Sequence, residues 1–176
     1  RILFNGNGYD AAWVKEATEV RGLSNYPTTP DCMPHLLDEK NVKMLTSHRV
    51  FSEAELQSRC EIMLENYCKQ VRIEANTMLE MARRMILPAI GCYADKLSKT
   101  AARKKAVIGD ISCSYETSIV KKISLLADSI YDKAEELEKE ISKLDQSGNV
   151  IDESKTIRDE LLPRMKSMRE DADLAE

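Results

Sequence analysis

One stripe of apolar residues constrains the fold of this chain more than any other feature. Between residues 120 and 144, apolar side chains recur in steps of three and four without a miss: Val120, Ile123, Ala127, Ile130, Ala134, Leu137, Ile141 and Leu144. Because an α-helix completes a turn in about 3.6 residues, these side chains share one face. A stripe sustained for about three and a half heptads is typical of a coiled coil or an antiparallel bundle. The sequence predicts a long helix that begins near Ser112 and packs against other helices.

The residues that follow the stripe predict an antiparallel partner for this helix. Gln146-Ser-Gly-Asn149 indicates a short turn, and Asp152 or Ser154 would cap a last helix. Since a short connection joins antiparallel neighbours, the two helices should form a hairpin. Pro163 should bend the last helix, because proline lacks an amide hydrogen and its ring clashes with the preceding turn. The apolar face of that helix is Ile157, Leu161, Met165, Met168 and Ala172.

A first long helix is predicted from Ser52 onward. Ser52 and Glu55 form a capping-box pattern, and Phe51 with Leu56 fits a hydrophobic staple across it. Pro88 predicts a bend or break between Arg84 and Pro88, after which the helix would resume toward Gly109-Asp110. Its predicted buried face is Leu56, Cys60, Met63, Tyr67, Val71, Met78 and Met85.

The methionines follow the same helical spacing. Methionine fills irregular gaps in cores and is also common on adaptable interfaces. We expect most of them in the core, while the excess between Met78 and Met85 leaves room for a subunit contact. The set comprises Met63, Met78, Met81, Met85, Met165 and Met168.

The first fifty residues carry short, irregular elements. Asp10 should cap a short helix over Ala11 to Arg21, which Gly22 would end. Thr29 is the predicted cap of another short helix, with Pro30 in its first turn. That helix should carry Leu36 and Leu37, and a further short helix should cover Asn41 to Ser47. The predicted fold class is all-α: a long antiparallel helical bundle or coiled-coil-like hairpin after an N-terminal segment of short helices. We divide the chain into a junction segment, 1–50, and a helical domain, 51–176.

Composition predicts a soluble, cytoplasmic protein. The chain has 176 residues and a net charge of −4, which gives no general attraction to nucleic acid or to an anionic membrane. No apolar run approaches the roughly 20 residues of a membrane span. The five cysteines are odd in number and scattered, which favours reduced, mostly buried thiols over a disulfide framework. Because the chain begins at Arg1 and not Met, we expect it to be a piece of a longer protein.

Few residues suggest chemistry. Asn5-Gly-Asn-Gly8 lacks the Lys-Ser/Thr of a phosphate-binding loop, so a tight turn is favoured. Cys32 and His35 have a zinc-ligand spacing, but His48 is the only other histidine and a structural zinc needs four ligands. A catalytic Cys–His pair also needs a third group that orients the histidine, and the sequence gives no sign of one. We therefore assign no catalytic, cofactor-binding or metal-binding residue in this chain.

Two sets of charged residues are also interpreted without a catalytic or metal-binding role. Glutamates on facing helices can hold a di-metal centre, but neither histidine follows a glutamate by three positions, so solvated or salt-bridged side chains are favoured. These glutamates are Glu61, Glu65, Glu74 and Glu80. The basic run comprises Lys96, Lys99, Arg103, Lys104 and Lys105. It suits a helix C-terminus, and we interpret it as a solvated face or as a contact for an acidic partner surface within an oligomer.

An ordered series of short segments gives a more specific indication. Phe4-Asn-Gly-Asn-Gly-Tyr9 with Trp13 and Arg21-Gly22-Leu23 resembles the junction at which the catalytic domain of a type III glutamine synthetase meets its C-terminal helical region. Further matching segments are Glu16-Ala17, Pro34-His-Leu-Leu37, Val50-Phe-Ser-Glu-Ala-Glu-Leu56, Glu61-Ile-Met-Leu-Glu-Asn-Tyr67, Ile73-Glu-Ala75, Thr77-Met78, Ile86-Leu-Pro-Ala89, Leu162-Pro163, Met168-Arg169 and Asp173. Asp10 stands where serine is expected, Cys32 where alanine is common, Cys60 where tyrosine is, and Cys68 where serine is.

The resemblance implies a role without chemistry for this region. Members of the family join ammonia to glutamate through a γ-glutamyl phosphate made from ATP, use magnesium or manganese, and assemble as stacked rings. Their metal and substrate motifs lie before the region that this chain resembles, and the last catalytic-domain strand would lie around Ile2 to Phe4. The expected function is a non-catalytic C-terminal helical domain of this ATP-dependent glutamate–ammonia ligase of nitrogen metabolism. Its expected partners are the rest of the synthetase and neighbouring subunits of a homo-oligomer. The alternative is a free-standing coiled-coil interaction module.

Overall fold

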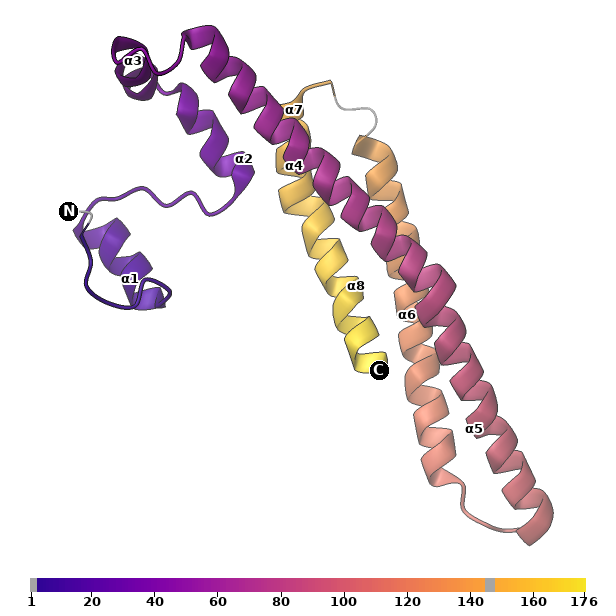
Figure 1. The fold of residues 1–176 in the computed structure, drawn as a ribbon. Coiled ribbons are helices and arrows are strands. Elements are labelled where there is room, and N and C mark those ends of the chain that lie inside the picture. Colours follow the sequence, from indigo (N-terminus) through magenta and orange to yellow (C-terminus); the bar gives the residue numbers. More distant parts are fainter. Residues whose placement is uncertain (1–2, 145–147) are drawn as a thin grey trace. The chain divides into compact units, whose positions relative to one another are not determined.

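The structure is a computed structural model that describes residues 3–144 and 148–176. It is built from helices joined by short connections, with no strand in those two ranges (Figure 1). The chain divides into two compact units, Arg1–Met63 and Leu64–Glu176. The all-α prediction is confirmed, while the functional division at residue 50 stays a prediction. Leu3 and Phe4 form no strand, because a strand needs a neighbouring strand to pair with, and Ile2 lies outside the described residues.

The first unit opens with a short capped helix, as the sequence predicts. Asp10 accepts a hydrogen bond from the Ala12 amide (2.9 Å) and so caps α1 (Ala11–Lys15), which runs on as one π-helical turn, η1 (Glu16–Val20). Gly22 follows at φ +64°, a conformation that glycine adopts without steric cost, and there the helix ends. The backbone carbonyl oxygen of Asn7 accepts a hydrogen bond from the Asp10 amide (3.2 Å), so the predicted turn before this helix is present.

Aromatic stacking ties the first residues of this unit to α1 and η1. The rings of Phe4 and Trp13 stack with centroids 4.0 Å apart. The guanidinium carbon of Arg21 lies 4.8 Å from the Trp13 centroid, and an Arg21 Nη1 donates to the Leu3 carbonyl (2.6 Å). A carboxylate oxygen of Glu16 accepts from Arg21 Nη2 at 2.6 Å. Residues that carry the family resemblance at this junction therefore form one local cluster.

Two further short helices and the start of a long one complete the unit. The elements are α2 (Thr29–Cys32), the 3-10 turn η2 (Met33–Leu37), α3 (Glu39–Ser47) and the start of α4 (Glu53–Met81). The predicted Thr29 cap is wrong: Thr28 is in extended conformation and caps α2 through Asp31, while Pro30 lies in the first turn, where no intrahelical amide donor is needed. α3 begins two residues before the predicted Asn41.

The predicted capping box at the start of α4 is confirmed. The Ser52 amide donates to Glu55 Oε2 (2.7 Å), and the Glu55 amide donates to Ser52 Oγ (3.3 Å). The Ser52 hydroxyl also donates to Glu55 Oε2 (2.9 Å), and the hydrogen bonds from the Ser52 amide and hydroxyl lower the pKa of the Glu55 carboxyl. The ring of Phe51 lies under the guanidinium of Arg59, 4.4 Å from its carbon, and the staple with Leu56 stays a prediction.

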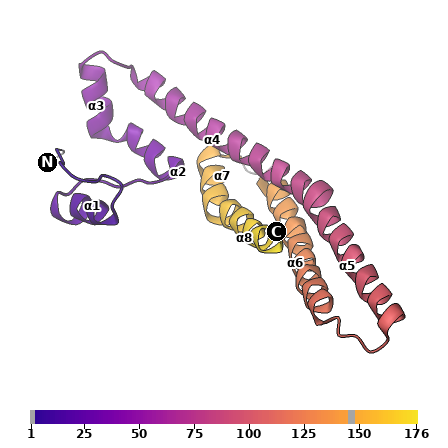
Figure 2. The ribbon, with the colours of Figure 1, turned by 60° about the horizontal axis from the view of Figure 1, so that its bottom comes forward.

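The second unit is a long helical hairpin with a third helix along part of it. α4 continues through η3 (Ala82–Ile86) into α5 (Leu87–Ile108), and the chain returns as α6 (Ser114–Leu144). The last run consists of α7 (Val150–Thr156), η4 (Ile157–Leu161) and α8 (Leu162–Ala175). α6 contacts both α5 and α8, as Figures 1 and 2 show. The predicted hairpins are therefore confirmed.

The apolar stripe of α6 forms the centre of the core. Ile123, Ile130, Ala134, Leu137, Ile141 and Leu144 are buried, and Val120 and Ala127 are half-buried. The predicted face of the last helix is also confirmed, with Ile157, Leu161, Met165 and Met168 buried and Ala172 half-buried. Asn149, and not Asp152 or Ser154, caps α7 by accepting the Ile151 amide (3.0 Å). Most of the predicted turn before it lies outside the described residues.

The predicted face of the first long helix is confirmed in part. Leu56, Cys60 and Val71 are buried, and Tyr67 and Met78 lie at the edge of the buried face. Met63 and Met85 are exposed, as is Met81, whereas Leu64, Ala75 and Leu79 are buried. The prediction is wrong at Met63 and Met85 because apolar residues stand at adjacent positions there, and adjacent positions on a helix are only about 100° apart. Spacing alone could not decide which of the two phases faces the core.

The two prolines do not break their helices. Each follows a π-helical turn: the Leu87 amide bonds to the Ala82 carbonyl before Pro88, and the Leu162 amide bonds to the Ile157 carbonyl before Pro163. A π turn adds one residue, which moves the preceding carbonyl away from the proline ring. The predicted break near Pro88 is therefore wrong, and the helical run from Glu53 to Ile108 is continuous.

Candidate functional site

The histidine that was considered as a zinc ligand or a catalytic residue makes contacts with residues close to it in sequence. His35 stacks on Tyr26 with ring centroids 3.9 Å apart, and its Nδ1 lies 3.0 Å from Asp38 Oδ2. Cys32 is exposed. Within residues 3–144 and 148–176, no three or more His, Cys, Asp or Glu side chains are grouped as a metal ion would need.

The glutamates of α4 are exposed and bonded within their own helix. Glu65 pairs with Lys69 (2.9 Å), Glu80 pairs with Arg84 (2.7 Å), and Glu74 accepts from Gln70 Nε2 (2.9 Å). Glu61 accepts from Gln57 Nε2 at 3.4 Å. Each contact joins residues four apart, the spacing that brings side chains together on a helix surface. The prediction of salt-bridged or solvated glutamates is confirmed.

The cysteines are all free, and three of the five are buried. Burial raises the pKa of the Cys68 thiol to about 11. Cys60 donates to the Met33 carbonyl at 3.4 Å, and burial raises the pKa of its thiol too. A raised pKa keeps a thiol protonated and unreactive at neutral pH. Cys60 and Cys68 therefore serve packing, while Cys32 and Cys92 are exposed.

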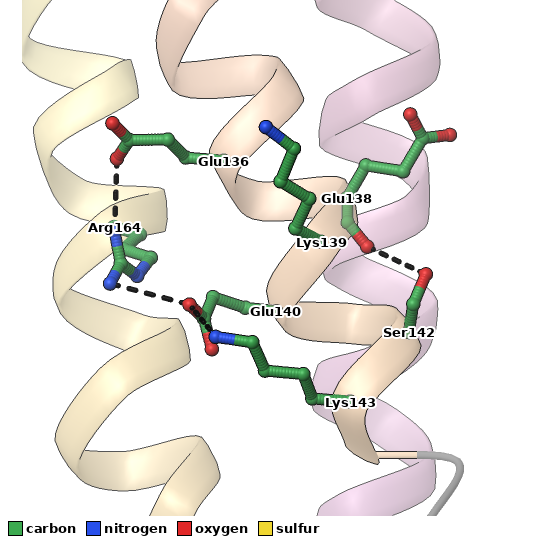
Figure 3. A pocket seen from close by; sticks show the side chains of 7 residues that line it. All are labelled: Glu136, Glu138, Lys139, Glu140, Ser142, Lys143 and Arg164. Carbon is green, nitrogen blue, oxygen red and sulfur yellow. Dashed lines mark hydrogen bonds and ion pairs between the residues drawn. The ribbon is translucent and has the colours of Figure 1, made fainter.

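A cavity of about 730 Å³ at the end of α6 is lined mainly by charged side chains, and Figure 3 shows its lining. Arg164 reaches across from α8 and pairs with Glu136 (2.9 Å) and Glu140 (3.4 Å). Lys143 approaches the same Glu140 carboxylate at 2.8 Å. The Glu136 and Glu140 carboxylates thus pair with cations, and the pairs with Arg164 join α6 and α8.

Similar ion pairs join the helices along the rest of the unit. Arg83 of η3 binds Glu135 (2.7 Å) and Glu138 (2.6 Å) of α6, which raises the pKa of the guanidinium and lowers that of Glu138. Lys133 of α6 binds Asp171 of α8 at 2.5 Å, and the Ser129 hydroxyl donates to the same carboxylate. The sequence analysis missed these pairs, because the partners lie far apart in sequence and helical spacing does not identify them.

One carboxylate of the second unit is almost fully buried. Glu116, in the first turn of α6, is 3% exposed and pairs with Lys104 of α5. The Lys104 ammonium and the Glu116 backbone amide lower the pKa of this carboxyl, and Glu116 in turn raises the pKa of Lys104. Cys113 donates to the Ala101 carbonyl (3.6 Å) beside it. The pair joins the two helices of the hairpin next to its turn.

The second unit also contains an apolar groove of about 630 Å³. Side chains from α4, η3, α6 and α8 line it, chiefly Ile73, Met78, Met81, Ile86, Met165 and Met168. It continues into a second hollow of about 520 Å³, which shares Ile86, Ala172 and Asp173 with it and reaches Met85 and Tyr93. Ile73, Met81 and Met85 are exposed along its edge. Continuous exposed apolar surface usually marks an interaction site.

Comparison with known proteins relates this chain to one family of domains. The family model described as "Glutamine synthetase C-terminal domain" matches residues 1–105. The chain is 34% identical over all of its 176 residues to a glutamine synthetase of Butyrivibrio fibrisolvens, where the match covers 25% of that protein. It is 42% identical over 94 residues to the type-3 glutamine synthetase of Dictyostelium discoideum, which is 53% of this chain and 12% of that protein.

A third relative is also matched over only a small part of its own length. A glutamine synthetase of Bacteroides fragilis (strain YCH46) is 31% identical over 127 residues, which cover 70% of this chain and 17% of the relative. The chain thus spans at most a quarter of the length of these relatives. A family model over most of the chain, and a relative aligned along all of it, show that this chain belongs to the glutamine synthetase C-terminal domain family.

Proposed function

We propose that this chain is a structural and assembly domain of a glutamine synthetase, and that other parts of the parent protein carry out the chemistry. The observation that carries the proposal is the contrast between its polar and apolar surfaces. Arg83 and Arg164 of the second unit form ion pairs with carboxylates of α6 and so join helices, whereas Met81 and Met85 expose apolar surface along a groove. Such a surface is suited to burial against another protein.

The parent protein would supply what this domain lacks. Phosphoryl transfer to glutamate depends on metal ions and cations held around the developing charge. We place ATP and the magnesium or manganese ions in the catalytic part of the parent, and none in this chain. The partners of the domain are then the rest of the synthetase and neighbouring subunits of a homo-oligomer. A free-standing coiled-coil module is not favoured, since the family model describes a domain of a larger enzyme.

The proposed location is the cytoplasm, where ATP is available. Among the helices that the structure describes, none combines the length and apolar character needed to cross a bilayer. The free state of all five cysteines also suits a reducing compartment.

Two measurements test the proposal. Calorimetric titration of the isolated chain with Mg²⁺ and ATP should give no saturable binding at micromolar concentrations, and saturable binding would contradict the non-catalytic role. In the parent protein, Met81→Asp with Met85→Asp should reduce the assembly seen by light scattering, because the groove edge would become charged. Leu125→Asp with Tyr131→Asp is the matched control, since both residues are exposed and apolar but lie outside the groove. An unchanged assembly in the Met81/Met85 variant would contradict the assembly role of the groove.

A further inference from the structure

The end of the α5–α6 hairpin carries a charge opposite to that of the rest of the chain. Residues 96 to 122 contain seven basic and two acidic side chains, a net charge of +5 within a chain of net charge −4. We call this region the basic tip. Both acidic residues of the basic tip lie near its turn. Asp110 is in the turn itself, and Glu116 forms an ion pair with Lys104. The excess positive charge is therefore not balanced within the tip.

Most of these cations have no ion-pair partner in the part of the chain that the structure describes. Lys99 pairs with Asp95 (2.6 Å) and Lys104 with Glu116. The remaining five are exposed and have no ion pair to any residue in the described ranges: Lys96, Arg103, Lys105, Lys121 and Lys122. Their charges are available to a partner.

Two of the available cations lie on one face of α5 together with an exposed apolar residue. Lys96, Arg103 and Val107 stand seven and four residues apart, so they share one face of α5. At a rise of about 1.5 Å per residue they extend over roughly 16 Å of the helix. Val107 is 83% exposed, and the adjacent Ile108 is exposed as well. A solvated helix end would not need two large apolar side chains in water.

We propose that the basic tip is a docking surface for an acidic surface of another protein, one that carries carboxylates beside an apolar residue. Interfaces of this kind use complementary charge for steering and orientation, and use apolar contact for adhesion. The inference goes beyond the assembly role of the groove and does not depend on it, because its test uses this chain alone.

The shape and charge of the unit favour a protein over a membrane. A bilayer that meets the end of a rod reaches only the charges at that end, whereas Lys96 and Val107 are about 16 Å apart along the helix. A bilayer alongside the rod would need a continuous apolar face for insertion, and Lys96, Lys99, Thr100 and Arg103 occupy that face before Val107.

Charge also disfavours a long polyanion such as nucleic acid. Outside the basic tip the chain carries a net charge of −9, and residues 123 to 176 contain fifteen acidic and eight basic side chains. A long polyanion would extend beyond the tip and meet this acidic part. Repulsion acts within the screening length of about 8 Å at physiological salt. A compact acidic protein patch can contact the tip without that repulsion.

The test compares two variants with the same change in net charge. In the tip variant, Lys96, Arg103 and Lys105 are replaced by Glu. In the control variant, the exposed Lys139, Lys155 and Lys166 are replaced by Glu. The corresponding Gln variants provide the same comparison should charge reversal disturb folding, which circular dichroism reports.

The probe is a synthetic helical peptide with a stripe of glutamates and leucines, and binding is measured by fluorescence anisotropy. The tip variant should bind at least about tenfold more weakly than the parent, with little change in the control. Affinity should also fall between about 0.1 M and 1 M salt, and replacing the leucines of the peptide by serine should weaken binding. Equal losses in tip and control variants, or tighter binding to phosphatidylserine vesicles or duplex DNA than to the peptide, would overturn the proposal.

Discussion

Replacing Ile130 by Asp should severely destabilise the second unit. Ile130 is 0% exposed at the centre of the α6 stripe, with Ala82 and Met168 in the same core cluster. Loss of the buried isoleucine side chain alone costs about 2–5 kcal/mol, as for truncation to alanine. A carboxyl group without a partner adds a further cost of at least about 1–3 kcal/mol. The sum of several kcal/mol is a large fraction of the roughly 5–15 kcal/mol that stabilises a typical domain.

The matched control lies on the same helix. Leu125 is 62% exposed, so Leu125→Asp makes the same kind of change in solvent and should alter stability by no more than about 0.5 kcal/mol. Thermal unfolding followed by circular dichroism compares the two variants. At about 2–4 °C per kcal/mol for a chain of this size, Ile130→Asp should melt about 10 °C or more below the parent. If both variants melt within about two degrees of the parent, the stripe does not face a core.

Two other substitutions test specific features of the hairpin. Glu116→Gln should destabilise the chain at neutral pH, because the folded-state pKa of Glu116 is lowered. The stabilisation is present above the unfolded pKa of about 4.3 and is lost as pH falls through the lower folded-state pKa, so urea unfolding should show the stabilities of variant and parent converging as the solution is acidified below the unfolded pKa. Pro88→Ala should leave the π turn at Ala82–Ile86 in place, since reverting to α geometry would rotate Ile90 out of the core. Greatly faster or slower amide exchange over residues 82–90 would contradict this.

The long helices could be predicted from the sequence because their cores are nearly continuous apolar stripes. Along α6, every member of the predicted stripe is buried or half-buried. The capping box at Ser52 and the helix end at Gly22 were equally predictable, since each depends on side chains or a backbone conformation a few residues away. Interactions between residues that are close in sequence are the ones that a single sequence predicts most directly.

Features that depend on two distant segments could not be predicted in this way. The exposure of Met63 and Met85, beside buried Leu64 and half-buried Ile86, reflects the position of α6 and α8, and not the local spacing of apolar residues. The pairs Arg83–Glu135 and Lys133–Asp171 join residues 52 and 38 positions apart. The groove exists because helices that are far apart in sequence leave space between them. Only the excess of methionine between Met78 and Met85 gave a sign of it.

The two π turns explain how both outer helices remain continuous against α6. Each contains one residue more than an α-helical turn, immediately before a Leu-Pro pair, and each contacts α6. The buried positions shift in phase across the first turn. Ala75, Leu79 and Ala82, the first residue of the turn, are buried at steps of four and three, and the next buried position is Ile90, eight residues after Ala82. A plain α-helix would bring Ile90 about 80° around from Ala82. The extra residue removes most of that rotation, so the same side of the helical run faces α6 before and after the proline. Each of these π turns therefore sets the phase of its helical run, and the proline that follows does not end the helix.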